Sequence, residues 1–179
     1  IPVKIIGAPA AKFLTQADGS VLVDGKLPPV TEYQVIAKSD EPSIAGLRLD
    51  VLSHTPAAKG RKEKPKPARF RLTEVKIETA SDEKFTTPTT LKLAQATADY
   101  DEPGMPATKA IDGNRKTHWG ADSQADEDHW ATFWFAEPLI AKAGGSQPQW
   151  FRVTLDQAEK GLRIYEFRLS TVTGKRPEA

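Results

Sequence analysis

The chain has 179 residues, of which 39% are hydrophobic and 27% charged, a composition typical of a folded protein rather than a disordered one. Its 25 basic and 24 acidic residues give a net charge of +1, which gives no reason to expect a nucleic-acid partner. The lack of cysteine excludes a disulfide framework and a thiolate metal site, and no apolar run is long enough to insert into a membrane. We therefore expect a single module over residues 1–179. Because the chain begins at Ile1 and not at a methionine, we expect it to be part of a larger protein.

Short segments of strand character follow one another along the chain, separated by glycine and proline. The expected strands cover residues 20–23, 32–38, 45–52, 70–79, 90–97, 129–135, 149–156 and 162–172. No long segment has helical periodicity. This pattern predicts an all-β fold, a β-sandwich of jelly-roll type.

Alternation of apolar and polar residues predicts which side chains face the core. In 149–156, the apolar Phe151, Val153 and Leu155 share one face, which places Trp150 and Arg152 on the other. In 129–135, the same rule directs Trp130 and Trp134 away from the core. The alternation changes phase within 70–77 and 162–169, close to Glu74 and Glu166. Such a change is typical of a β-bulge, so we expect a bulge at each glutamate.

The segment 109–119 predicts a tight turn that can bind a cation. Asp112-Gly113-Asn114 has strong turn chemistry, because glycine and asparagine tolerate positive φ and aspartate bonds to nearby backbone. Such a turn can direct carboxylate, carbonyl and hydroxyl oxygens at one point, as a hard cation such as calcium requires. A plain turn without metal is the alternative interpretation.

Two further segments suggest binding. Tryptophan is uncommon on an exposed strand face, so Trp130, Trp134 and Trp150, with Arg152 beside them, are candidates for a sugar-binding surface. Cover of these side chains by another part of the chain is the alternative. The Pro-rich segment 56–69 has six basic residues and one acid, and we expect an exposed loop there that can attract an anionic polysaccharide.

Several segments resemble, in the same order, a module of large planctomycete-type proteins that also carry cytochrome c-like domains. These segments are ADGSVLVDGKLPPVTEYQV, IAGLRLDVL, RFRLTEVKI, AIDGNRKTHWGAD, HWATFWFAEPL, FRVTLDQ and IYEFRLST. The resemblance implies an accessory module of an exported protein, secreted, periplasmic or on the cell surface, whose partners include the other domains of its parent.

The loop and the strand after it also resemble discoidin-like and carbohydrate-binding modules with a galactose-binding-like fold. That resemblance implies one structural calcium ion. Its ligands would be the side chain of Asp112, the backbone carbonyls of Lys109 and Asn114, Thr117, and a glutamate from a strand. The glutamate would be Glu74, with Glu166 as the alternative.

Catalysis has little support in the sequence. The histidines His54, His118 and His129 have no metal-ligand spacing, and no Gly-x-Ser-x-Gly nucleophile motif occurs. We therefore expect a non-catalytic carbohydrate-binding module with a structural calcium that tethers a larger exported protein to polysaccharide. The alternative is a structural or protein-interaction domain without a glycan site.

Overall fold

The protein is an all-β sandwich, as the sequence predicts. The computed structural model describes residues 2–25, 27–53, 69–124, 126–140 and 149–178, and within these ranges it contains strands and two 3-10 turns but no α-helix. The strands are β1 (Pro2–Ile6), β2 (Ala11–Thr15), β3 (Val21–Gly25), β4 (Thr31–Ser39), β5 (Ser43–Val51), β6 (Glu74–Ala80), β7 (Thr89–Thr90), β8 (Leu93–Ala98), β9 (His129–Ile140), β10 (Gln149–Gln157) and β11 (Glu166–Val172). The 3-10 turns are η1 (Ala107–Ala110) and η2 (Asp122–Gln124). None of the described residues forms a helix capable of crossing a bilayer.

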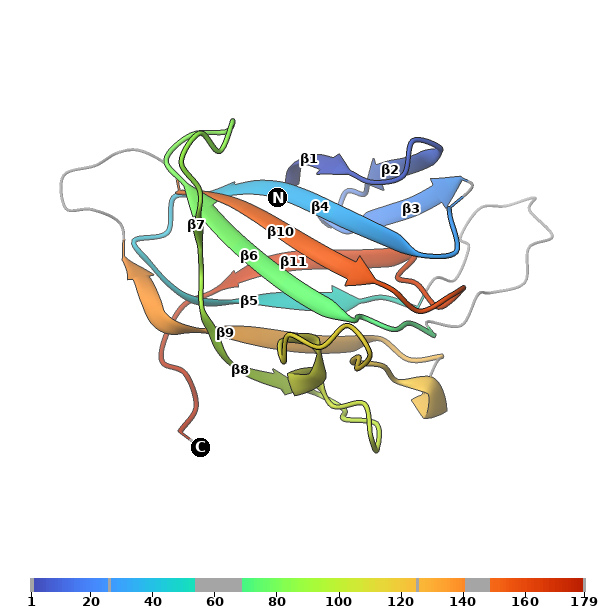
Figure 1. Ribbon diagram of the computed structural model, residues 1–179. Coiled ribbons are helices and arrows are strands. Elements are labelled where there is room, and N and C mark those ends of the chain that lie inside the picture. Colours follow the sequence, from blue (N-terminus) through green and yellow to red (C-terminus); the bar gives the residue numbers. More distant parts are fainter. Residues whose placement is uncertain (1, 26, 54–68, 125, 141–148, 179) are drawn as a thin grey trace.

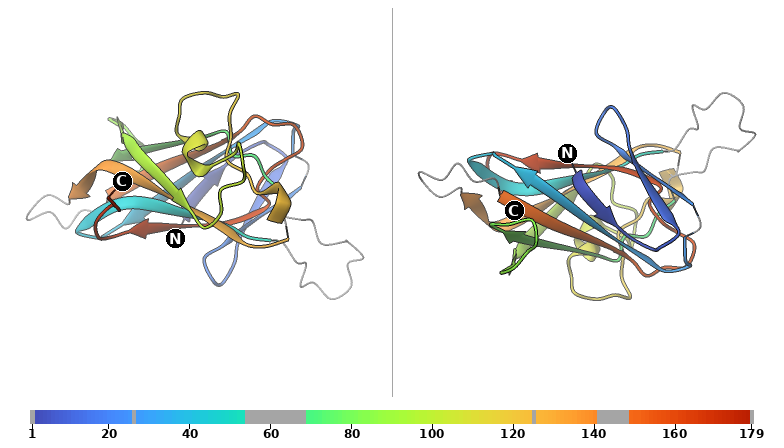
Figure 2. Two further views of the ribbon diagram at one scale, coloured as in Figure 1. Left: turned by 90° about the horizontal axis from the view of Figure 1, so that it is seen from below. Right: turned by 90° about the horizontal axis from the view of Figure 1, so that it is seen from above.

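Two antiparallel sheets pack against each other (Figures 1 and 2). One has the strand order β1-β4-β10-β6-β7, and we call it the β10 sheet after its central strand. The other has the order β2-β3-β11-β5-β9-β8, and we call it the β11 sheet. The N-terminal strands β1 and β2 lie together at one edge of the sandwich, and β8 lies at the opposite edge (Figure 1).

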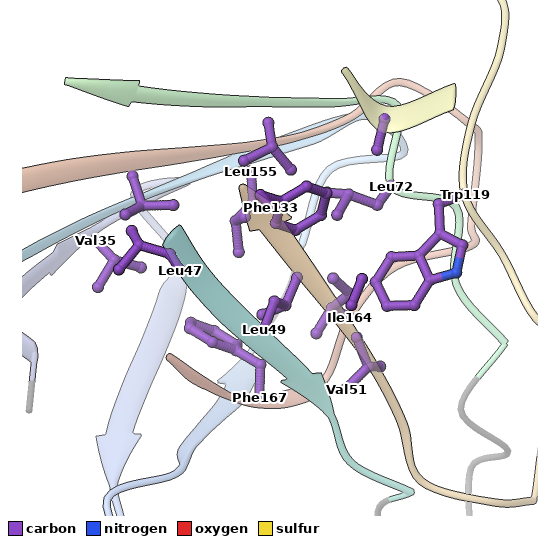
Figure 3. Close-up of a cluster of buried hydrophobic side chains, with 14 of the residues drawn as sticks. Val35, Leu47, Leu49, Val51, Leu72, Trp119, Phe133, Leu155, Ile164 and Phe167 are labelled. Atoms are coloured by element: carbon purple, nitrogen blue, oxygen red, sulfur yellow. The ribbon is translucent and has the colours of Figure 1, made fainter. Parts of the chain in front are cut away.

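One apolar core lies between the two sheets. Figure 3 shows Val35 and Leu155 of the β10 sheet facing Leu47, Leu49 and Phe167 of the β11 sheet. The other large, fully buried side chains include Trp119, Tyr33, Phe70, Phe133, Phe151, Ile44, Leu72, Ile77 and Ile164. The core therefore combines residues from both ends of the chain.

The faces of β10 agree with the predicted alternation. Phe151, Val153 and Leu155 are buried in the core, and Trp150 and Arg152 point away from it and are half-buried. The pattern is regular because β10 is paired along its length with β4 on one side and β6 on the other.

The predicted bulges at Glu74 and Glu166 are wrong. Neither residue lies at a register shift; each is the first residue of its strand, β6 or β11. Before Glu74 the chain pairs with Trp119 through Leu72, and afterwards it pairs with β10. The apolar phase changes because the chain changes its pairing partner.

The N-terminal strands β1 and β2 were not expected from the sequence. The N-terminal segment that contains them is rich in proline and alanine, which are weak signals for strands. As edge strands they need pair on one side only, and β1 accommodates Pro2 at its first position, where a missing N–H is tolerated.

Candidate functional site

The Asp112 loop has the turn geometry that its sequence predicts. Gly113 has φ of 74°, and the backbone N–H of Asn114 donates to Oδ1 of Asp112 over 2.9 Å. The hydroxyl of Thr117 lies 2.9 Å from each Asp112 carboxylate oxygen and 2.8 Å from the carbonyl oxygen of Asn114. Carboxylate, hydroxyl and carbonyl oxygens therefore converge within one short loop.

Glu74 lies beside this loop although it is distant in sequence. Burial is the largest cause that raises the pKa of Glu74, and the neighbouring carboxylate of Asp112 raises it further. The backbone N–H groups of Gly113 and Asn114 are close enough to oppose that rise, yet Oε1 of Glu74 is buried without a hydrogen bond from any described residue. The carboxylate of Glu74 thus lies close to the Asp112 loop and has one buried oxygen without a donor.

These groups fit a hard cation. A buried acceptor without a donor costs free energy, and a cation would satisfy it while offsetting the repulsion between Glu74 and Asp112. No cluster of three or more His, Cys, Asp or Glu side chains occurs in the described ranges, so a cation here would also need carbonyl and hydroxyl oxygens. The ammonium of Lys109 lies 3.5 Å from Oδ2 of Asp112, so this carboxylate already has one positive neighbour.

The structure places Glu166 away from the loop. Its carboxylate accepts a hydrogen bond of 3.1 Å from the hydroxyl of Ser20, and it pairs with Leu22 in the β11 sheet. Glu74 begins a strand of the other sheet and interacts with Asp112. Of the two glutamates, only Glu74 is near the residues with which a shared cation was predicted.

The tryptophans do not form one surface. Trp130 and Trp134 lie on β9, on the outer face of the β11 sheet, whereas Trp150 and Arg152 lie on the outer face of the β10 sheet. The two groups therefore lie on opposite sides of the sandwich. Alternation within each strand is correct, but a continuous platform of the three indoles is ruled out.

On the β11 sheet, the indoles are covered. Trp134 is only 9% exposed and donates its Nε1–H to the hydroxyl of Thr97 over 3.0 Å. Trp130 is half-buried, and the guanidinium of Arg48 stacks 4.4 Å above its ring centre. Arg48 is itself fixed by Asp50, to which its Nε donates over 2.8 Å. For Trp134 the structure therefore agrees with the second interpretation from the sequence, in which the outward side chain is covered by another part of the chain.

On the β10 sheet, Trp150 belongs to a small apolar cluster outside the main core. It packs against Ile36, Ala80 and Phe85. Arg152 lies over the ring of Phe85, 4.7 Å from its centre, and its Nε donates to Glu78 over 2.7 Å. Among the described residues, no partner bonds the two terminal nitrogens of Arg152.

A hollow of about 660 Å³ adjoins this cluster. Its lining combines apolar surface with both signs of charge, from Lys4, Ile36, Asp82, Glu83, Lys84, Phe85 and Arg152. Its volume falls in the range of about 300–1,000 Å³ that is usual for small-ligand sites. The hollow therefore offers an apolar floor and charged, hydrogen-bonding groups around it.

The loop that forms one wall of the hollow is held in an unusual conformation. Phe85 has φ of 52°, the one positive φ at a non-glycine position among the described residues. Asp82 fixes the loop, because its carboxylate accepts from the N–H of Lys84 over 2.9 Å and from the hydroxyl of Thr86 over 3.1 Å. Such backbone strain costs roughly 1–3 kcal/mol and concentrates at functional sites.

Of the two histidines in the described part of the chain, His129 is bonded at both ring nitrogens. The two ring nitrogens of His129 lie 3.0 Å from a carboxylate oxygen of Asp99 and 2.9 Å from the carbonyl oxygen of Gln124. Burial lowers the pKa of His118. In the nearby acidic segment, Asp122 is bonded to Arg71, and Asp128 accepts from Ser53. These carboxylates are therefore engaged in structural contacts.

Most of segment 56–69, the expected basic loop, lies outside the described residues, as does His54; only Arg69 is described, and it is exposed.

Comparison with known proteins identifies no relative. No family model, no curated protein and no solved structure matches this chain.

The sequence analysis missed the residues that complete the hollow. Phe85 was not singled out because it stands alone in a polar turn, and Lys4 belongs to a strand that was not expected. The pattern Asp82 to Thr86, an aspartate four residues before a threonine in a turn, was the one local signal for a fixed loop.

Proposed function

We propose that this chain is a non-catalytic carbohydrate-binding module that tethers a larger exported protein to polysaccharide. The observation that carries the proposal is the hollow beside Trp150 and Arg152, where apolar and charged side chains meet on the outer face of the β10 sheet. A sugar ring has an apolar C–H face and a rim of hydroxyls, so it needs both kinds of surface at once.

The roles of the residues follow from their chemistry. The apolar cluster around Trp150 would pack against the C–H face of a sugar ring. The terminal nitrogens of Arg152 would donate to hydroxyl oxygens, and the exposed Glu83 would accept from hydroxyl hydrogens. Lys4 and Lys84, both exposed, would favour a polysaccharide that carries carboxylate or sulfate groups.

A calcium ion is part of the proposal as a structural element. Asp112, Glu74, Thr117 and the backbone carbonyls of Lys109 and Asn114 would hold it. The unsatisfied Oε1 of Glu74 supports this assignment. The ion would supply positive charge between two carboxylates and stiffen the loop; no catalytic role is assigned to it.

The sugar site can be tested by affinity electrophoresis in gels that contain neutral or acidic polysaccharides. Arg152→Ala and Trp150→Ala should each weaken retardation by roughly 5- to 150-fold in affinity, as expected for about 1–3 kcal/mol from a binding-site anchor. Trp130→Ala is the matched control, because it removes an indole from the opposite face. If Trp130→Ala abolishes retardation and Arg152→Ala does not, the hollow is not the site.

A structural or protein-interaction domain is the second candidate. The observation in its favour is that Arg48 covers Trp130 and that Trp134 is buried, so the outer face of the β11 sheet presents no aromatic platform. If no polysaccharide retards the folded protein, this second function replaces the first.

A further inference from the structure

One strand in the middle of the β11 sheet has a free edge. Strand β11 pairs with β5 from Phe167 to Val172, but on its other side it pairs with β3 only at Glu166 and Phe167. Figure 1 shows β11 continuing past the start of β3. Before Val21 the chain turns away from β11 at Asp18 and Gly19. No other described segment therefore pairs with this side of β11 beyond the start of β3.

The hydrogen-bond pattern identifies which backbone groups are left over. The N–H of Leu52 donates to the carbonyl of Glu166, and the N–H of Val23 donates to the carbonyl of Tyr165. Since an antiparallel strand bonds to its two neighbours through alternate residues, Leu169 and Thr171 direct their N–H and C=O groups away from β5. Among the described residues, no group bonds to these four.

A groove runs beside this edge, between the two sheets. It has a volume of about 340 Å³, and its floor consists of Leu47, Phe151, Val153 and Leu169. Ala37, Lys38 and Ser39 of β4 form the opposite wall. At the end near β3, Asp18 and Arg168 form an ion pair of 3.7 Å between exposed side chains, which contributes little to closing the groove.

We propose that this groove binds an extended segment of a partner polypeptide, which adds a strand to the β11 sheet in line with β3. Strand β3 shows what fits there: its inward side chains, Val21 and Val23, are 0% and 4% exposed between the same two sheets. A partner strand should therefore alternate valine-sized side chains, facing the floor, with polar ones facing solvent. Arg168 at the rim is already paired with Asp18 and Asp50, so the open backbone edge and the apolar floor, rather than charge, select the segment.

The proposal is independent of the sugar site, which lies on the outer face of the β10 sheet and not between the sheets. The probe is a seven-residue peptide that alternates valine with threonine. Binding is followed by amide chemical shifts of the isotope-labelled protein. The peptide should move the signals of Leu169 and Thr171, and Arg152→Ala should leave this binding unchanged.

Two controls distinguish strand addition from nonspecific binding of an apolar peptide. A peptide methylated on alternate backbone nitrogens cannot donate to the edge and should not bind. Thr171→Pro removes one outward N–H without removing a bond to β5, so it should weaken binding by about tenfold or more. Thr90→Ala, which changes an exposed side chain on the edge strand β7 of the other sheet, should bind like the unaltered protein.

If millimolar peptide leaves the Leu169 and Thr171 signals unchanged, the edge does not accept a strand. Equal binding of the methylated peptide would also overturn the proposal, whether or not Thr171→Pro folds.

Discussion

Replacement of Glu74 by glutamine tests the cation site, because it removes a charge and nearly preserves shape. A ligand that binds only the folded state at 100 times its Kd raises the free energy of unfolding by about 2.7 kcal/mol. For a chain of this size, 1 kcal/mol corresponds to a Tm change of about 2–4 °C, so calcium should raise the Tm of the unaltered protein by about 5–11 °C. In Glu74→Gln this increase should be lost or strongly reduced.

With calcium, Glu74→Gln should melt at a lower temperature than the unaltered protein. Without calcium, it should melt at a higher one. Burial and the carboxylate of Asp112 raise the pKa of Glu74, so the folded chain binds a proton there more tightly than the unfolded chain does. The stability from this group is present below the pKa of Glu74 in the unfolded chain and is lost as pH rises through the raised pKa. In chelator at neutral pH, Glu74→Gln should therefore melt at a higher temperature than the unaltered protein.

The assay is thermal unfolding followed by circular dichroism, with calcium or with chelator, from pH 4 to pH 8. Glu166→Gln is the matched control. Glu166 lies in the β11 sheet and accepts a hydrogen bond from Ser20, so its replacement should leave the response to calcium intact. Identical melting curves with calcium and with chelator would refute the site. A full calcium response in Glu74→Gln would refute the role of this glutamate.

Two further substitutions test the packing in urea titrations. Trp119→Ala should lower the free energy of unfolding by about 3–5 kcal/mol, because the indole is fully buried, whereas Trp130→Ala should lose mainly the stacked Arg48, about 0.5–1 kcal/mol; equal losses would show that Trp130 is a core residue. Gly46→Ala should cost about 1–3 kcal/mol, because a Cβ at this position would lie 2.6 Å from the carbonyl oxygen of Phe133. An unchanged midpoint for Gly46→Ala would mean that β5 and β9 can separate there without cost.

The sequence predicted what depends on local chemistry. The faces of β10 follow from alternation, and the Asp112 turn follows from an aspartate, a glycine and an asparagine in succession. Both features need only neighbours along the chain. The same holds for the all-β class, which follows from short apolar segments and the turns between them.

The sheet to which each strand belongs could not be predicted in this way. Alternation shows that Trp130 and Trp150 point away from the core, but it does not show that their strands belong to different sheets. That information lies in pairings between distant segments. The position of Phe85 under Arg152 likewise depends on how a loop folds back over β10, which no local pattern encodes.

The order of strands in the two sheets has a consequence for how this chain acquires its structure. Strand β10 lies between β4 and β6, and β11 lies between β3 and β5, so the strand that joins each pair is made after both of its neighbours. During synthesis, β3 and β4 can pair with β2 and β1 on one side, but the edges of β3 to β6 that receive β10 and β11 stay open until those strands are made. Contacts between such distant segments form slowly, because the entropy of closing long loops is lost first.

Aggregation during synthesis is therefore the main hazard for this topology, since unpaired edges and uncovered apolar faces persist until β11 is available. Thr31 in β4, for example, pairs with Gln157, which emerges more than a hundred residues later. The same arrangement ties both sheets to the C-terminal part of the chain, so neither sheet keeps its order of strands if β10 and β11 detach.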